Sequence, residues 1–380
     1  MKNILLLNLI LLSFLGCNRY KSTDTKKILT FEIDENNVRE ELNIKDIFDS
    51  LRLTPLKYSK GIIGQIESII FSNDKYFVHD SSIDQILIFD SNGNYLNKIY
   101  AQGPGPKEYG AIHFFDLDKL SQQIVIFDVS MGGLSYFDFN GNFLHKKRLP
   151  LICRDFAVTK SGNIICYSPD ELVEKNNSVY QPGVFLLSKN GEIIDHKEMG
   201  NTGFIPMLTG KSLIEYNKMN YLFSNYNDVI YEITDTKINP FAQLNFKNKI
   251  NNEVFYNSNF KTENMLAPFL KINPYKRKKH IGFTFLQKGE IRFMDVNLET
   301  KDYRIGKKLK KDEQFKFFNL NGFQVSDNEF VTILNDEVLL QYKQYLKTST
   351  ATDFEQEFQD LQNMLALNGN NPILVSAYFN

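Results

Sequence analysis

The chain has 380 residues, of which 42% are hydrophobic and 23% are charged, and its formal net charge is −1 at pH 7. This balance is typical of a globular protein, and the lack of a basic excess argues against a general nucleic-acid-binding protein. The length accommodates one large all-β domain or two ordinary domains. The 32 Phe and 19 Tyr residues favour β-strands, because aromatic side chains pack well on a pleated surface.

The first 17 residues have the pattern of a targeting segment. Lys2 gives a positive start, and Ile4–Leu15 is an apolar run of signal-peptide length, too short to span a bilayer. Gly16-Cys17 follows directly, and this arrangement resembles a bacterial lipobox. The resemblance implies that the signal peptide is removed and that Cys17 becomes lipidated; an ordinary secretory signal is the alternative.

Residues 18–27 are polar and are predicted to form a tether. No later window is apolar for the 18 or more residues that a membrane helix needs, so we expect an anchored protein that does not span the membrane. The tether lacks an acidic run after the cysteine. The sequence therefore leaves open which side of the outer membrane the domain faces.

The stretch from Ile66 to Tyr109 alternates short apolar runs with polar turns. This pattern predicts four antiparallel strands followed by a stiff loop, Gln102–Tyr109. Similar four-strand units follow at about 112–149 and 156–197. The chain is therefore expected to repeat one supersecondary unit.

An Asn-Gly dipeptide recurs before the last strand of each unit, at Asn92-Gly93, Asn140-Gly141 and Asn190-Gly191. By subtraction of their residue numbers, the glycines are 48 and 50 residues apart. Asn-Gly is a strong hairpin signal because both residues tolerate positive φ. A fixed turn in a repeated four-strand unit of roughly 40–50 residues indicates the blades of a β-propeller.

Three later units are less regular. Expected strands are 213–216, 221–224, 228–234 and 241–246; then 281–286, 290–296 and 303–309; then 317–325, 329–334 and 337–345. A polar insertion is expected over about 247–279, and the basic run 276–280 is interpreted as a solvated loop. Six blades is the expected count, with seven if the insertion hides strands.

The end of the chain departs from the blade pattern. Apolar residues at helical spacing predict a helix over Thr352–Leu367, and Ile373–Phe379 is expected to be a final strand. A propeller ring must be closed, because an open sheet edge invites aggregation. We therefore predict that the N-terminal strands and Ile373–Phe379 complete the last blade, with the helix packed over the junction.

Three features together resemble the six-bladed β-propeller lipoproteins of Gram-negative bacteria, which are relatives in shape of NHL-repeat propellers. They are the lipobox-like start, the run Ile47–Leu56, and the blade end Gly103–Tyr109 together with the terminal Asn371–Val375. The resemblance implies an all-β fold, a six-bladed β-propeller of four-stranded antiparallel blades with a short C-terminal helix near the ring closure. It implies one domain over 28–380 and lipid anchoring to the outer membrane in the cell envelope.

Candidate ligand-binding residues follow from the geometry of propellers. The innermost strands line a channel, and the loops that lead into them form one face. The residues expected at those loops are Gln65, Glu108, Tyr109, His113 and Arg154. A structural role is the alternative for each, with 103–109 serving as a connector between blades.

Besides Cys17, the chain contains Cys153 and Cys166. A tight turn at Thr159–Gly162 would place residues opposite each other when their numbers sum to about 322, whereas those of Cys153 and Cys166 sum to 319. A disulfide needs its two Cα atoms within about 7 Å. The expected register therefore predicts two free thiols.

No metalloprotease, serine-hydrolase or zinc-site signature is present, so we expect no catalytic residue, metal ligand or cofactor. The sequence favours a membrane-anchored binding or scaffold protein with a glycan, peptide or partner protein on the channel face. A propeller hydrolase or lyase with a metal in the channel is the alternative, because ligands contributed by several blades would show no sequence motif. A purely structural envelope protein is a third reading.

Overall fold

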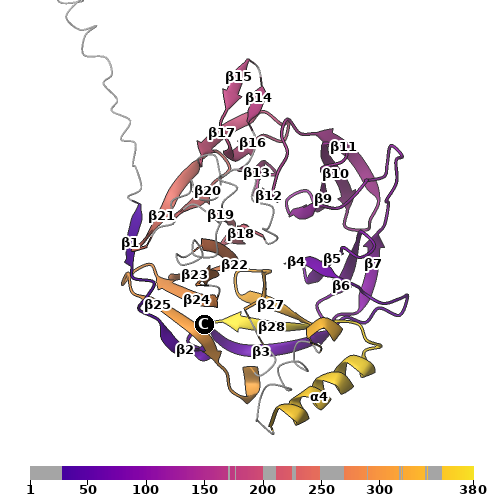
Figure 1. The fold of residues 1–380 in the computed structure, drawn as a ribbon. Coiled ribbons are helices and arrows are strands. Elements are labelled where there is room, and N and C mark those ends of the chain that lie inside the picture. The colour runs from indigo at the N-terminus through magenta and orange to yellow at the C-terminus, as the bar shows by residue number, and fades with distance from the viewer. Residues whose placement is uncertain are drawn as a thin grey trace, which may run out of the picture.

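The computed structural model describes residues 28–169, 172–175, 177–199, 211–224, 228–248, 269–288, 290–315, 318, 320–338, 340 and 353–380. These residues form six blade sheets arranged around a central axis, together with one separate two-stranded sheet (Figure 1). The predicted all-β, six-bladed propeller is confirmed. The predicted signal peptide, Cys17 and the tether over 18–27 lie outside the described residues.

Blades 1 to 3 are consecutive antiparallel meanders, as the repeat predicts. Blade 1 contains β4 (Ile66–Ser72), β5 (Lys75–Asp80), β6 (Gln85–Asp90) and β7 (Tyr95–Ile99). Blade 2 contains β8 (Phe114–Asp118), β9 (Gln123–Asp128), β10 (Gly133–Asp138) and β11 (Phe143–Arg148). Blade 3 contains β12 (Asp155–Val158), β13 (Ile164–Ser168), β16 (Gly183–Leu187) and β17 (Ile193–Glu198), with a small hairpin of β14 (Val173–Lys175) and β15 (Ser178–Tyr180) between its second and third strands.

Blades 4 to 6 include strands from both ends of the chain. Blade 4 contains β18 (Leu213–Tyr216), β19 (Met219–Phe223), β20 (Val229–Ile233), β21 (Ile238–Phe246) and the N-terminal β1 (Leu29–Ile33). Blade 5 contains β22 (Phe269–Arg277), β23 (His280–Gln287), β24 (Glu290–Asn297), β25 (Tyr303–Lys310) and β2 (Arg39–Asn43). Blade 6 contains β26 (Gly322–Gln324), β27 (Glu329–Leu334), β28 (Ile373–Phe379) and β3 (Phe48–Pro55).

The hydrophobic core lies between neighbouring blades. Phe77 and Ile88 of blade 1 pack in one cluster with Phe115 and Ile126 of blade 2, and all four side chains are buried. Such alternating apolar residues must be covered on both sheet faces, which a ring of stacked blades achieves.

The repeated Asn-Gly turns adopt a conformation in which only the glycine has positive φ. Gly93, Gly141 and Gly191 have φ of 76°, 83° and 80°, and the strand pairing shifts register before each turn. This is the pattern of a turn closed by a glycine bulge, which increases local strand twist. The asparagines therefore do not need the left-handed region that the sequence pattern allowed them.

The N-terminal strands are distributed over three blades. β1 pairs in parallel with β21, β2 pairs in parallel with β25, and β3 pairs antiparallel with β28. The expectation that all N-terminal strands complete the last blade is therefore wrong for β1 and β2. Blades 4 and 5 gain a fifth, parallel outer strand instead, and β3 with β28 closes the ring as predicted.

The C-terminal helix α4 (Asp353–Leu367) packs over the ring closure, as predicted. Leu361 and Leu365 belong to one buried cluster with Phe48 of β3 and Ile373 of β28. In Figure 1 the helix lies outside the ring beside blade 6. The contact between α4 and β3 thus reinforces the closure.

Two expectations for the later blades are wrong. The polar insertion over 247–279 contains the inner strand β22, although the blade count stays at six. The third strand of blade 6 is β28 and not 337–345, because the described residues 336–338 are helical. A polar strand that lines the axis and a strand separated by an insertion both escape a pattern based on apolar runs.

The basic run 276–280 is not a solvated loop at its start. Lys276 and Arg277 are buried on β22. The Lys276 ammonium donates to the carbonyl of Lys278 at 2.9 Å and lies 4.5 Å from the ring centroid of Tyr216. Arg277 lies 3.4 Å from the carboxylate of Asp295, so both charges have partners in the interior.

The prediction of two free thiols is wrong, because Cys153 and Cys166 form a disulfide with a Cα–Cα distance of 5.3 Å. The predicted register itself is correct, since Asp155 pairs with Tyr167 and Phe156 pairs with Cys166. Cys153 precedes β12 and lies outside this ladder. The rule of summed residue numbers therefore does not apply to it.

Among the described residues, no helix has both the length and the apolar character needed to cross a bilayer.

Candidate functional site

The propeller has two faces, which we name by the direction of the inner strands. The inner strands are β4, β8, β12, β18, β22 and β26, and Figure 1 shows β4, β12, β18 and β22 near the centre. The start face is where these strands begin, and the end face is where they end. All the ligand-binding residues predicted from the sequence belong to the start face.

Repeated carboxylates hold the start face together. Asp80 and Asp128 are fully buried at the ends of β5 and β9. They accept hydrogen bonds from the amides of Gly64 at 3.3 Å and Gly110 at 2.6 Å, which precede the inner strands of the same blades. A buried carboxylate that pairs with backbone amides is a structural anchor. These two acids therefore fix the loops that lead into β4 and β8.

The loop 103–109 is closed upon itself. The Tyr109 side chain is 0% exposed, and its hydroxyl donates to the carbonyl of Asp84 at 2.7 Å. Burial raises the pKa of Tyr109 above its ordinary value. Glu108 accepts a hydrogen bond from the amide of Gly105 at 2.7 Å. Both side chains thus shape the connector between blades 1 and 2.

The other three predicted residues have exposed side chains at the starts of three successive blades. Gln65 precedes β4 and its carbonyl accepts from the amide of Ser81 at 2.8 Å. His113 precedes β8, and its Nδ1 accepts from the amide of Val129 at 3.3 Å. Arg154 precedes β12. That Gln65, Glu108, Tyr109, His113 and Arg154 contact a ligand stays a prediction.

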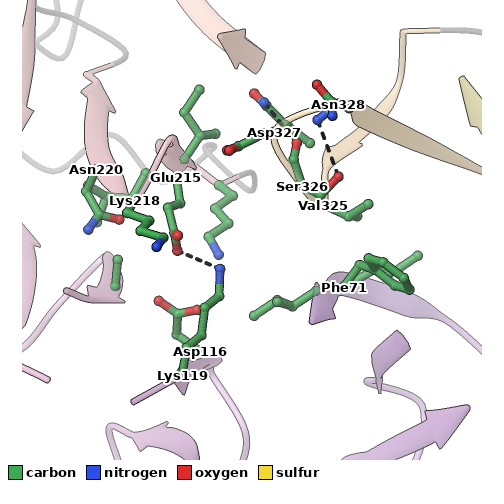
Figure 2. Close-up of a pocket in the computed structure, with 17 residues that line it drawn as sticks. Phe71, Asp116, Lys119, Glu215, Lys218, Asn220, Val325, Ser326, Asp327 and Asn328 are labelled. Carbon is green, nitrogen blue, oxygen red and sulfur yellow. Dashed lines mark hydrogen bonds and ion pairs between the residues drawn. The ribbon is translucent and has the colours of Figure 1, made fainter. Parts of the chain in front are cut away.

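A pocket of about 370 Å³ lies around the axis, mostly at the end face. Its walls come from the last residues of β4, from β8 and its following turn, from the β18–β19 hairpin and from the β26–β27 turn. Figure 2 shows the side chains of Asp116, Lys119, Glu215 and Asp327 converging on this space from blades 2, 4 and 6. We call it the end-face pocket. It contains none of the five residues predicted from the sequence.

Six charged side chains line the end-face pocket: Lys119, Lys211, Lys218, Asp116, Glu215 and Asp327. Lys119 and Glu215 form an ion pair of 2.8 Å that joins blade 2 to blade 4 (Figure 2). Within the described parts of the chain, the other four have no oppositely charged side chain within ion-pair distance. Lys211 interacts electrostatically with the buried carboxylate of Asp155. The pocket therefore presents charges of both signs, Lys218, Asp116 and Asp327, that no ion pair among the described residues compensates.

Hydrogen bonds hold two of the acids in place. Asp116 is 9% exposed, and one of its carboxylate oxygens accepts from the amide of Val158 at 2.7 Å. Asp327 accepts from the amide of Asn217 at 2.7 Å, which ties blade 6 to the β18–β19 hairpin. In both residues the second oxygen stays available. The fold therefore fixes the positions of these charges without using their full hydrogen-bonding capacity.

Asn220 is the least exposed polar side chain of the pocket wall, at 3%. Among the described residues its side-chain amide has no hydrogen-bond partner. The side chain is largely buried, but its amide is not among the fully buried polar groups that lack a partner, so it is accessible from the pocket. A ligand or water in the pocket can therefore satisfy it. The apolar part of the wall comes from residues such as Ile69, Phe71 and Val325.

The pocket wall is mixed, since charged and amide side chains alternate with apolar ones such as Ile69, Leu213 and Val325. In the described ranges, no three His, Cys, Asp or Glu side chains are grouped so that they could hold a metal ion. The volume lies at the small end of the range of ligand pockets, about 300–1,000 Å³.

A family description, "Domain of unknown function (DUF4934)", matches residues 28–378. The chain belongs to the DUF4934 family. No curated protein matches this sequence. The family assignment agrees with the fold predicted from the sequence but carries no activity with it.

Three of the solved structures similar to this DUF4934 propeller are bacterial proteins. A Bacteroides fragilis protein thought to be exported is 18% identical with a TM-score of 0.71, covering 93% of this chain and 100% of that one. A DUF4221-family protein of Bacteroides vulgatus is 12% identical with a TM-score of 0.41, covering 88% and 97%. Virginiamycin B lyase of Staphylococcus aureus is 12% identical with a TM-score of 0.38, covering 68% and 74%. At these identities only the first similarity is informative, and it concerns the fold.

The end-face pocket of this DUF4934 propeller has little signature in the sequence. Four of its six charged residues lie at the ends of inner strands or in the turns that follow, as with Lys119 after β8 and Lys218 after β18, whereas Asp116 lies within β8 and Lys211 precedes β18. Polar turns are expected in every hairpin, so these look ordinary in the sequence. The usable signal is that the turns belong to inner strands and carry charges of both signs.

Proposed function

We propose that this protein is a binding protein of the cell envelope, anchored through a lipid on Cys17, that holds its ligand in the end-face pocket. The observation that carries the proposal is the set of charged and amide side chains around this pocket, most of which the fold leaves without side-chain partners. Function resides in such sites and not in the propeller fold itself.

Three observations support the envelope location. The N-terminal sequence resembles a lipobox. The Cys153–Cys166 disulfide is of the kind that persists in oxidising compartments such as the periplasm. The similar Bacteroides fragilis structure belongs to a protein thought to be exported. None of these features distinguishes the two faces of the outer membrane.

Lipid anchoring is tested by the variant Cys17→Ala in the full chain, expressed in a Gram-negative host. The wild-type protein is expected in the membrane fraction with a fatty-acid label, whereas the variant is expected to lose the label. An unlabelled wild-type protein would contradict the anchor. The double variant Cys153→Ala with Cys166→Ala is the control for loss of cysteine, because it removes both disulfide cysteines, leaves no free thiol and does not touch the lipobox.

Binding is tested with glycan, peptide and envelope-protein arrays probed by the full chain and by Ser326→Trp. Ser326 lies on the β26–β27 turn at the pocket wall, so an indole there is expected to occupy the cavity and to lower binding at least tenfold. The thermal midpoint of the variant should stay within a few degrees of wild type. A ligand that binds both proteins equally would place the site elsewhere, with the start face as the next candidate.

The alternative of a hydrolase or lyase with a metal in the channel stays a hypothesis. No particular arrangement among the described residues favours it. The same arrays, followed by product analysis of each bound ligand, would detect turnover.

A further inference from the structure

We propose that the end-face pocket takes a zwitterionic ligand, a free amino acid or short peptide with ionised ends, and not a neutral glycan. This inference rests on the proposed function and adds a chemical class to it. It is argued from the charges, the amides and the aromatic content of the pocket wall.

Unpaired charges of opposite sign lie on different sides of the pocket wall. Lys218 from blade 4 has no carboxylate partner, and Asp116 and Asp327 from blades 2 and 6 have no ammonium partner, within the described residues. Lys211, also from blade 4, interacts electrostatically with the buried carboxylate of Asp155. The cationic and anionic groups thus come from different blades. A ligand that carries a carboxylate and an ammonium group can pair with both sets at once, which a ligand of one sign or of none cannot.

The charged residues of the pocket wall are balanced as a whole. Three lysines and three acids give a formal charge of zero, and one pair, Lys119 with Glu215, already compensates itself. A strongly anionic ligand such as a polyphosphate would face the carboxylates of Asp116 and Asp327. Like charges at close range disfavour it, so the wall selects for balanced charge.

Uncharged polar side chains also line the pocket. The side chains of Asn220, Ser326 and Asn328 belong to the pocket wall. Gln324 also lines it, but its amide is already bonded to the backbone of Lys276 and Ser326. Amide side chains offer both donors and acceptors, which is the complement of a peptide group. Asn220 is the best placed for this, because its amide is accessible from the pocket and has no partner among the described residues.

The pocket wall has little of the aromatic surface that a glycan would need. Sugar rings stack on flat aromatic surfaces, and such platforms usually dominate glycan-binding sites. Phe71 is the only aromatic residue in the wall of the end-face pocket, as far as its described residues extend. The exposed aromatic surface that would favour a glycan is therefore small, and peptide chemistry fits the wall better.

The test uses random tripeptides with free ends as the probe, at equal concentrations with three counterparts: N-acetylated, C-amidated, and blocked at both ends. Binding to the full chain is read by saturation-transfer NMR, followed by calorimetry on the individual peptides that bind. Because a hydrogen bond between charged groups is strong, blocking either end is expected to weaken binding about tenfold to a hundredfold. Maltose serves as the neutral saccharide.

Variants locate the two charge contacts. Lys218→Met removes an exposed ammonium at the hairpin tip, and Asp116→Asn removes a charge while keeping an oxygen that can accept from Val158. Each is expected to lower affinity for the free tripeptide about tenfold and to leave the fully blocked peptide unaffected. Lys189→Met, on an exposed turn of blade 3, is the matched control and should bind like wild type.

Each outcome has a defined meaning. Loss of binding on blocking either end, with loss in both pocket variants, supports the inference. Equal binding of blocked and free peptides, or maltose binding that Ser326→Trp abolishes, overturns the zwitterion but leaves the proposed function in place. If no array ligand shows any sensitivity to Ser326→Trp, the proposed function fails, and the inference fails with it.

Discussion

The two faces of the propeller differ in what their polar residues do. On the start face, Asp80 and Asp128 are fully buried and bonded to backbone amides of their own blades. On the end face, the charged residues line an open pocket, and one pair of them, Lys119 with Glu215, bridges two blades across it. The carboxylates of the start face are bonded to the backbone, whereas most charged groups of the end face are accessible to a ligand.

Repetition between blades distinguishes structural polar residues from a candidate binding site in the same ring. The start face has more repeated polar residues, yet repetition at equivalent positions of successive blades indicates a structural requirement of the blade. The end-face residues Asp116, Glu215 and Asp327 come from different blades and do not repeat a bonding pattern. A site in a propeller is therefore best sought where the repeat breaks down.

The largest expected effect is on the start face. Asp128→Ala should lower the free energy of unfolding by about 3–5 kcal/mol, because the amides of Gly110 and Met131 and the hydroxyl of Ser130 lose a buried acceptor. The thermal midpoint of unfolding should fall by about 2–4 °C for each kcal/mol of stability lost. Asp138→Ala is the control, since that aspartate makes similar bonds at a partly exposed turn. Equal losses in both variants would contradict the distinction.

The disulfide should have the next largest effect. The double variant Cys153→Ala with Cys166→Ala should lose about 3 kcal/mol, because the bond closes a segment with a sequence separation of 13 residues. Thermal unfolding with and without a reductant measures it. The reductant should lower the midpoint of wild type and leave that of the double variant unchanged. A wild-type midpoint that does not respond would mean that the bond adds little.

Asp155 should show a pH-dependent effect of intermediate size. It is buried, and burial raises its pKa to about 6 although the amides of Ser212 and Leu213 donate to it. A raised carboxyl pKa contributes stability that is present below its ordinary value of 3.8 and lost as pH rises through about 6. Asp155→Asn should therefore be more stable than wild type by about 1–3 kcal/mol at pH 7.5, since one pKa unit equals about 1.4 kcal/mol.

The gain from Asp155→Asn should disappear near pH 4, where wild-type Asp155 is protonated as well. Thermal midpoints over pH 4–8 check this, with the exposed Asp49→Asn as control. If Asp155→Asn is instead less stable at pH 7.5, the two amide bonds to the carboxylate outweigh its burial.

The smallest effect on stability is expected on the end face. Glu215→Gln breaks the ion pair with Lys119. The side chains of Glu215 and Lys119 are 32% and 39% exposed, so the free energy of unfolding should fall by less than about 1 kcal/mol. Differential scanning measurements at low and high salt would show a small difference that shrinks with salt. A loss comparable to that of Asp128→Ala would make the pair structural and would remove the contrast between the faces.

Much of the fold could be predicted because it depends on local signals. The Asn-Gly turns mark the last hairpin of blades 1 to 3, and the strands around them match the predicted ones. The helix over 353–367 follows from its apolar spacing. What failed depends on distant contacts. β1 and β2 find partners more than 200 residues away, as with Leu29 and Ala242.

Burial and chain direction explain the other misses. Lys276 looks solvated in the sequence, yet Tyr216 and a carbonyl satisfy its charge inside the protein. Cys153 lies before its strand, where no ladder register applies. The end-face pocket collects side chains from blades 1, 2, 3, 4 and 6, and no sequence spacing brings them together. Only the closed ring defines it.

The placement of β1, β2 and β3 has a consequence for how the protein is made. The ribosome produces these strands first, but their partners Ala242, Gly306 and Ile373 are produced much later. Three outer strands must therefore remain unpaired while most of the polypeptide is synthesised, and contacts between such distant residues form slowly. A nascent chain that stops before β28 has no closed ring. Closure of the ring therefore requires β28, so we expect a polypeptide that ends before Ile373 to leave β3 without its partner.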